Sequence, residues 1–267
     1  GKVELVFVVD TSGSMYSEWA DVCTVIYGGN FASGGNFKGI KPMLQEGNMT
    51  VYETIYGLGN TLPGAAQSGN CATHYKNGQG PRNTALGLTA NDDSGGLRVL
   101  PGTVYNGATY SGYSGEDWGP GSNWACLSWK DTIGNVPGNP PTSSDHKWNP
   151  NATKIVLPVS DEGPKDGDPS QQADDTQSIN EAHDNCLNAG VIPVGLYGQS
   201  YGGAGNIESH MKDLAQCPNG VVSTATRNCP GSSVRSTDAG GQTYEFPSGT
   251  GGASQMQLLV EAMVYIS

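Results

Sequence analysis

An acid and two hydroxyls on alternate residues follow the first apolar segment of the chain: Asp10, Ser12 and Ser14 in the stretch VELVFVVDTSGSM. Residues i, i+2 and i+4 of an extended turn point the same way, so these side chains can face a common point. Gly13 allows the tight backbone that this needs. Ligands made only of oxygen atoms are typical of sites for Mg²⁺, or for Mn²⁺ or Ca²⁺ in a relaxed geometry. The motif therefore indicates a site for a hard divalent cation and not for zinc.

A second acid follows a later apolar segment, as Asp161 in the stretch KIVLPVSDEGP. In an open α/β sheet, ligands bind outside the carboxyl ends of the strands. Two acids at the ends of neighbouring parallel strands can therefore share one ion. The alternative is that Asp10 and the serines only cap the helix that follows, as Asp and Ser commonly do. The presence of Asp161 favours the metal site.

The elements that must position these acids can be predicted from apolar, β-branched segments bounded by turn residues. The predicted strands cover residues 3–9, 50–58, 154–159 and 191–197, with a short edge strand at 243–247. The first, third and fourth are apolar almost throughout, which is typical of parallel strands covered on both faces.

Helical spacing of apolar residues predicts helices between these strands. One helix carries the stripe from Trp19 to Ile26 and ends at Gly28; another opens at Asp168 and Pro169 and ends near Gly190. Two more cover residues 207–215 and the apolar C-terminal segment from residue 254. Strands that alternate with helices predict βαβ units. We therefore expect one domain, 1–267, of the α/β class, with a doubly wound, mostly parallel sheet flanked by helices.

Two irregular stretches, 92–149 and 218–241, interrupt this alternation, and each contains cysteine. Long irregular segments in compact domains are uncommon and are often functional, so we interpret both as ordered insertions. The aromatic side chains of the first stretch form either a recognition surface or the small core of the insertion itself. They are Tyr105, Tyr110, Tyr113, Trp118, Trp124 and Trp129.

The charge and hydropathy of the chain exclude two classes of partner. With 13 basic and 25 acidic residues, the net charge is -12, which repels nucleic acid and anionic lipid. No run approaches the roughly 20 apolar residues of a membrane helix, so direct membrane insertion is not expected. The chain opens directly in a strand and without a signal peptide, which is the pattern of a mature or excised domain.

Six cysteines form neither a C-x-x-C pair nor a zinc-binding spacing with histidine, so we expect disulfides. Disulfides indicate an extracellular, secreted or cell-surface location. The pairing stays open at this point, with Cys217–Cys229 and then Cys71–Cys126 as the first candidates. The other two cysteines are Cys23 and Cys186.

Several of these motifs resemble those of one family. The stretch VFVVDTSGSM resembles the D-x-S-x-S motif of von Willebrand factor A domains, which include the integrin inserted domains. IVLPVSDEGP resembles their second acidic motif, AGVIPVGLYG their next strand, and HMKDLAQCPNG with the closing helix their C-terminal portion. The resemblance covers about two thirds of the chain and does not extend over the two insertions.

The resemblance implies a metal-ion-dependent adhesion site. In that family both serines, a threonine from a middle loop and two acids hold the ion directly or through water, and a partner's Glu or Asp takes the open position. The corresponding residues here are Asp10, Ser12, Ser14, Thr84 and Asp161.

The middle threonine is where this sequence departs from the family pattern. In GQGPRNTALGLTAND we assign the ligand position to Thr84. An alternative alignment to the G-x-T-x-T pattern places Arg82 there, with Thr84 as the second threonine. An arginine at that position would weaken the metal site or replace the ion by its own charge.

The resemblance implies an extracellular adhesion domain that binds a protein or extracellular-matrix ligand through a divalent ion and a carboxylate of that ligand. One alternative is a structural or tip subunit of a pilus or surface filament, in which the fold is an assembly platform. A further alternative is an intracellular chaperone or chelatase-type partner subunit, against which the six cysteines argue.

An enzyme is not expected. The stretch YGQSYGG matches the G-x-S-x-G nucleophile elbow around Ser200. That fold needs serine, acid and histidine in this chain order, but no histidine follows His210, which lies in the predicted helix directly after the elbow. We therefore interpret residues 198–203 as a loop at the strand end.

Overall fold

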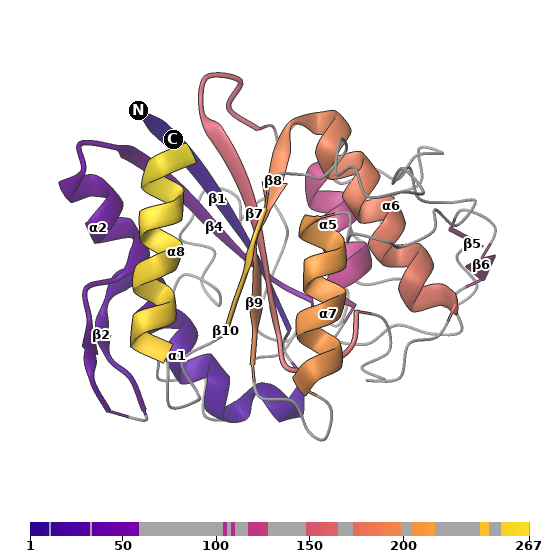
Figure 1. Cartoon of the computed structure of the whole chain (residues 1–267), viewed down its shortest axis with the longest axis horizontal. Coiled ribbons are helices and arrows are strands. Elements are labelled where there is room, and N and C mark those ends of the chain that lie inside the picture. The colour runs from indigo at the N-terminus through magenta and orange to yellow at the C-terminus, as the bar shows by residue number, and fades with distance from the viewer. Residues whose placement is uncertain are drawn as a thin grey trace.

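In this computed structural model, the chain folds into a parallel sheet that lies between two layers of helices (Figure 1). The residues that the structure describes are 1–10, 12–32, 34–58, 104–105, 108–109, 117–127, 148–164, 173–198, 204–216, 241–245 and 252–266.

The central sheet has the order β10-β9-β7-β1-β4, with β8 paired to β7, and all its pairings are parallel. Its strands are β1 (Lys2–Val9), β4 (Thr50–Gly57), β7 (Thr153–Ser160), β8 (Val191–Pro193), β9 (Gly195–Tyr197) and β10 (Thr243–Glu245). Because β1 lies in the interior of the sheet, its residues from Val3 to Val9 are fully buried apart from the slight exposure of Glu4. The α/β class and the parallel sheet are confirmed.

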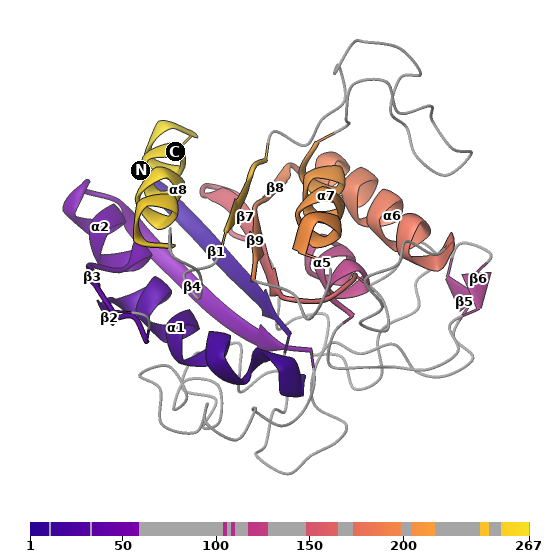
Figure 2. The same ribbon diagram turned by 60° about the horizontal axis from the view of Figure 1, so that its bottom comes forward.

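In the described part of the chain, three helices lie on each face of the sheet (Figures 1 and 2). On one face lie α1 (Tyr16–Tyr27), α2 (Ile40–Glu46) and α8 (Gly252–Ile266), and on the other α5 (Trp118–Cys126), α6 (Ala173–Ala189) and α7 (Ala204–Ala215). A 3-10 helix, η1 (Gly13–Met15), precedes α1. Among the described residues, two short strand pairs lie outside the sheet: β2 (Gly29–Asn30) with β3 (Asn36–Phe37), and β5 (Val104–Tyr105) with β6 (Ala108–Thr109). No helix in the described ranges is long and apolar enough to cross a membrane.

Most of the predicted elements are present among the described residues. The strand expected at 191–197 is divided at Val194, whose N–H donates to the carbonyl of Val156 at 2.8 Å. The edge strand expected at 243–247 is β10, which pairs with β9 at one end of the strand order. The described part of α6 begins at Ala173, so its predicted start at Asp168 lies outside the described residues.

Helix α5 lies within the stretch 92–149 and was not predicted, because its sequence WGPGSNWAC contains two glycines and a proline, which disfavour helices. The glycines allow close packing on both sides. A Cβ on Gly121 would lie 2.5 Å from Leu58 Cδ2 in the sheet layer, and one on Gly119 would lie 2.6 Å from Ser178 Oγ of α6. Thus α5 packs tightly between the sheet and α6. Stretch 218–241 lies outside the described residues except at Gly241.

Trp118, one of the aromatic residues considered for a recognition surface, is fully buried at the start of α5. Its indole Nε1 donates to the carbonyl oxygen of Glu162 at 3.0 Å. This side chain therefore belongs to the core and ties α5 to the segment that follows β7.

A disulfide between Cys126 and Cys186 joins α5 to α6. The candidate pair Cys71–Cys126 is therefore wrong, because Cys126 already has a partner 60 residues further along the chain. Cys23 of α1 is also disulfide-bonded, and no cysteine in the described part is free. The candidate pair Cys217–Cys229 lies outside the described residues.

We expect the double variant Cys126→Ala/Cys186→Ala to lose about 4 kcal/mol of unfolding free energy, because the bridge closes a loop of 60 residues and restricts the unfolded chain. Urea titration of the variant and the wild type at pH 7 measures the difference. A loss below about 1 kcal/mol would show that the bridge contributes little by this mechanism.

Candidate metal centre

The candidate site lies at the topological switch point of the sheet, between the neighbouring strands β1 and β7. From β1 the chain adds β4 on one side, and from β7 it adds β8, β9 and β10 on the other. Such a switch point opens a crevice at the carboxyl ends of the two strands, where ligands of α/β proteins bind. Asp10 directly follows β1 and Asp161 directly follows β7. The N–H of Asp10 donates to the carbonyl of Val159 at 2.9 Å, so the two strand ends are held together.

A chain of hydrogen bonds connects the two acids through the two serines. Asp10 Oδ1 accepts from the backbone N–H of Ser12 at 2.7 Å, and the hydroxyls of Ser12 and Ser14 are 2.8 Å apart. Ser14 Oγ donates to Asp161 Oδ1 at 2.9 Å. Because Ser14 has one hydroxyl hydrogen, Ser12 is the donor between the serines. Four of the five predicted ligands thus form one cluster, and their role as metal ligands stays a prediction.

The backbone that produces this cluster is not the extended turn expected from the sequence. Residues Gly13–Met15 form the 3-10 helix η1, and the N–H of Met15 donates to the carbonyl of Ser12 at 3.3 Å. The hydroxyls of the two serines lie close together for two reasons. The N–H of Ser12 is hydrogen-bonded to Asp10, and the helical turn η1 places Ser14 within hydrogen-bonding distance of Asp161. The N-cap of α1 is Met15, which makes no side-chain cap bond, so capping of α1 does not account for these residues.

Burial differs across the cluster. Asp10 is fully buried and Asp161 is 3 % exposed, whereas Ser12 and Ser14 are half-buried. The acids therefore form the floor and the serine hydroxyls lie nearer to solvent. A ligand approaching from outside would meet the hydroxyls first.

Burial raises the pKa of Asp10 from its ordinary value of 3.8 to about 8. Hydrogen bonds from Ser12 and Ser160 lower this pKa in part, and the negative charge of Asp161 raises it further. No basic side chain among the described residues contributes to the shift. A cation beside Asp10 would favour its ionised form, so the electrostatics of the cluster suit a metal ion.

A further acid, Glu18, lies beside Asp161. A Cβ on Gly198 would lie 3.0 Å from Asp161 Cβ and 3.3 Å from Glu18 Cγ, which places Glu18 of α1 next to Asp161 across this glycine. Glu18 is only 5 % exposed. Asp21 lies one turn after Glu18 on α1, and burial raises its pKa. The hydrogen bond that its carboxylate accepts from the N–H of Ala32 lowers this pKa in part, and the negative charge of Glu18 raises it further. The site therefore lies in a region of negative potential.

Sequence reasoning missed Ser160. Its side chain is fully buried, and its Oγ donates to Asp10 Oδ2 at 2.6 Å while accepting from the N–H of Glu162 at 3.0 Å. The pairing of Val9 with Val159 in the parallel register places Ser160 beside Asp10. A hydroxyl residue at the end of a buried strand, next to a predicted metal-binding acid, is the signal that could have identified it.

The donor set fits a hard divalent cation, because it consists of two carboxylates and two hydroxyls from separate segments. Within the described part, no three His, Cys, Asp or Glu side chains come together to hold a metal ion. An ion here would therefore depend on the serines, on water and on any ligand from elsewhere in the chain. Thr84 and Arg82, the two candidates for the middle position, lie outside the described residues.

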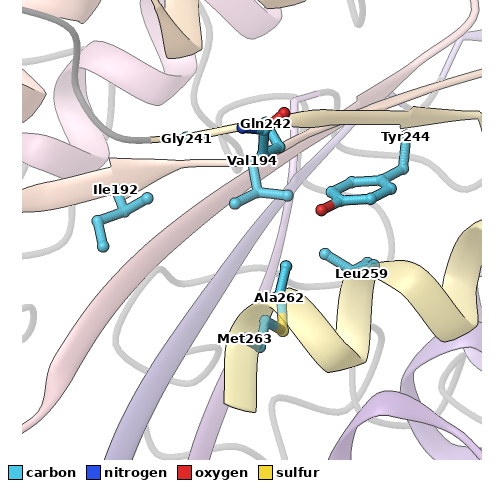
Figure 3. A pocket seen from close by; sticks show the side chains of 8 residues that line it. All are labelled: Ile192, Val194, Gly241, Gln242, Tyr244, Leu259, Ala262 and Met263. Carbon is cyan, nitrogen blue, oxygen red and sulfur yellow. The ribbon is translucent and has the colours of Figure 1, made fainter. Parts of the chain in front are cut away.

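A small apolar pocket lies elsewhere, between α8 and the strands β8 and β10 (Figure 3). Ile192 and Tyr244 line it from the sheet, and Leu259 and Met263 line it from α8. Ile192 pairs with Ile155 near the start of β7. Tyr244 pairs with Leu196, which in turn pairs with Val159 near the end of β7, so the pocket extends along the strands on the β8–β10 side of the sheet. Its position and apolar lining separate it from the candidate metal centre.

Neither a known protein-family model nor a curated protein sequence matches the chain. The oxygen cluster between β1 and β7 is therefore the feature of the molecule from which a function can be inferred.

In EDTA, we expect the unfolding free energy of the wild type to fall between pH 5 and pH 9 because of Asp10. We expect Asp10→Asn to lack this part of the fall. The folded chain keeps the Asp10 proton up to about pH 8, whereas the unfolded chain releases it near 3.8. Between these values the folded state binds more protons, so its unfolding free energy falls as the pH rises. Urea titrations from pH 5 to pH 9 should show the wild type losing stability relative to Asp10→Asn.

The matched control for this measurement is Glu261→Gln, which changes an exposed acid on α8 that accepts a hydrogen bond from Gln257. Its stability should follow the wild-type pH dependence. Parallel curves for the wild type and Asp10→Asn would contradict the raised pKa.

Proposed function

We propose that the chain is a von Willebrand factor A-type adhesion domain, secreted or displayed on the cell surface. It holds Mg²⁺, or Mn²⁺ or Ca²⁺, between the ends of β1 and β7 and binds an acidic group of a protein or extracellular-matrix partner through that ion. The observation that carries the proposal is the hydrogen-bonded chain from Asp10 through Ser12 and Ser14 to Asp161.

The composition of the cluster supports an adhesion site of this kind. Asp10, Ser12, Ser14 and Asp161 would hold the ion, and Thr84 would contribute from outside the described residues. A divalent ion held here would supply one open coordination position to a partner. If the two acids hold the ion through water, its direct ligands are the neutral serine hydroxyls and water, and its positive charge would attract an incoming carboxylate.

The burial pattern supports the same mode of binding. Asp10 and Asp161 lie at the floor of the cluster and the half-buried serines lie closer to solvent. A partner's acid would therefore approach from the serine side, and the buried acids would stay behind the ion. Segments outside the described residues, including most of 92–149 and 218–241, would set the specificity for the partner.

The extracellular location is supported by the disulfide between Cys126 and Cys186 and by the second disulfide that includes Cys23. Such bonds persist in oxidising compartments and are rare in the cytosol.

We expect the purified chain to bind Mg²⁺ and to bind one or more proteins of an extracellular-matrix panel only when Mg²⁺ is present. Isothermal titration with MgCl₂ and a solid-phase assay with the panel, in Mg²⁺ or EDTA, measure both. Asp10→Ala should weaken Mg²⁺ binding by more than about 100-fold, beyond the usual effect of an outer-shell group, and should abolish adhesion.

Asp184→Ala on α6 is the control acid and should behave as the wild type. Adhesion that persists unchanged in EDTA or in Asp10→Ala would rule out the ion-mediated mechanism.

A further inference from the structure

We infer that Ser160 is a positioning residue that fixes the carboxylate of Asp10 and thereby sets both the affinity of the site for Mg²⁺ and its preference for Mg²⁺ over Ca²⁺. This inference rests on the proposed metal site. It concerns a residue outside the D-x-S-x-S motif and outside the predicted ligand set.

The hydroxyl of Ser160 is held in one orientation. Its oxygen accepts the N–H of Glu162 at 3.0 Å, which leaves the hydroxyl hydrogen to be donated elsewhere. Two acceptors are in reach: Asp10 Oδ2 at 2.6 Å and the carbonyl oxygen of Glu162 at 3.3 Å. That carbonyl already accepts the indole N–H of Trp118 at 3.0 Å. The shorter bond to Asp10, which becomes charge-assisted when a bound ion keeps that carboxylate ionised, is therefore the favoured one.

Both oxygens of Asp10 are consequently held by donors from different strand ends. Oδ1 accepts the N–H of Ser12, which follows β1, and Oδ2 accepts the hydroxyl of Ser160, which ends β7. Two donors on opposite oxygens fix the plane of the carboxylate. Each oxygen keeps further acceptor capacity, so the clamp leaves room for an ion or for a water bound to it.

A fixed carboxylate affects the two cations differently. Mg²⁺ demands near-ideal octahedral geometry, whereas Ca²⁺ accepts six to eight ligands in flexible arrangements. Loss of the Ser160 hydroxyl frees one oxygen of Asp10 and allows the group to turn. The cost should fall mainly on Mg²⁺, and outer-shell partners of this kind typically change metal affinity by about 10–100-fold.

The experiment compares Ser160→Ala with Ser178→Ala in the full chain. Ser178 is an equally buried serine on α6 whose hydroxyl donates to the carbonyl of Asp175 at 2.9 Å, so it is a matched control away from Asp10. Titration with MgCl₂ and with CaCl₂ gives both dissociation constants. Ser160→Ala should weaken Mg²⁺ binding by about 10–100-fold and Ca²⁺ binding by much less. Ser178→Ala should change neither constant.

Two further variants separate positioning from folding. Ser160→Thr keeps the hydroxyl and should recover most of the Mg²⁺ affinity and the Mg²⁺ preference. Ser160→Cys is close to serine in shape but is a weak donor, so it should lose the preference as the alanine variant does. Thermal melts in EDTA identify any variant that does not fold, and if Ser160→Ala fails, the comparison of threonine with cysteine decides.

The outcomes distinguish this inference from the proposed function. If the wild type does not bind Mg²⁺, both are wrong. If the wild type binds Mg²⁺ and Ser160→Ala binds it equally well, the role of Ser160 is wrong and the metal site stands. An equal loss of Mg²⁺ and Ca²⁺ affinity without recovery in the threonine variant would assign Ser160 a structural role only.

Discussion

The structure depends on how the carboxylate of Asp10 is kept in the interior of the protein at the end of β1. Asp10 is fully buried, and its neighbour Asp161 adds negative charge instead of relieving it. Burying an ionised acid is costly unless hydrogen bonds or an opposite charge compensate for it. The chain supplies the hydrogen bonds from Ser12 and Ser160, and the raised pKa shows that they compensate only in part. A divalent cation is the partner that would complete the compensation.

The surrounding fold holds the pieces of this cluster in place. The parallel pairing of β1 with β7 brings Asp10 and Ser160 side by side, although 150 residues separate them in the sequence. Helix α5 packs on the sheet through Gly121 and contacts the segment after β7 through Trp118. The disulfide to α6 fixes the other end of α5. The geometry of the site is therefore supported from the sheet and from the helical layer on one face.

The sequence was sufficient for the parts of the fold that periodicity and apolar content determine. The strands β1, β4 and β7 could be predicted from their apolar and β-branched residues, and the convergence of Asp10 and Asp161 followed from the parallel sheet. Helix α5 could not, because its glycines disfavour a helix locally and are explained only by close packing against residues such as Leu58. Ser160 and the partner of Cys126 were missed for a related reason, since both depend on contacts between segments far apart in the chain.

Direct observation of the ion tests the central claim most directly. A crystal of the chain grown in Mn²⁺ and measured at the manganese absorption edge should show an anomalous peak between the ends of β1 and β7. The same site in Mg²⁺ should show oxygens of Ser12 and Ser14 at about 2.1 Å from the ion. A saturated crystal without density there, or with the guanidinium of Arg82 in that position, would contradict the account.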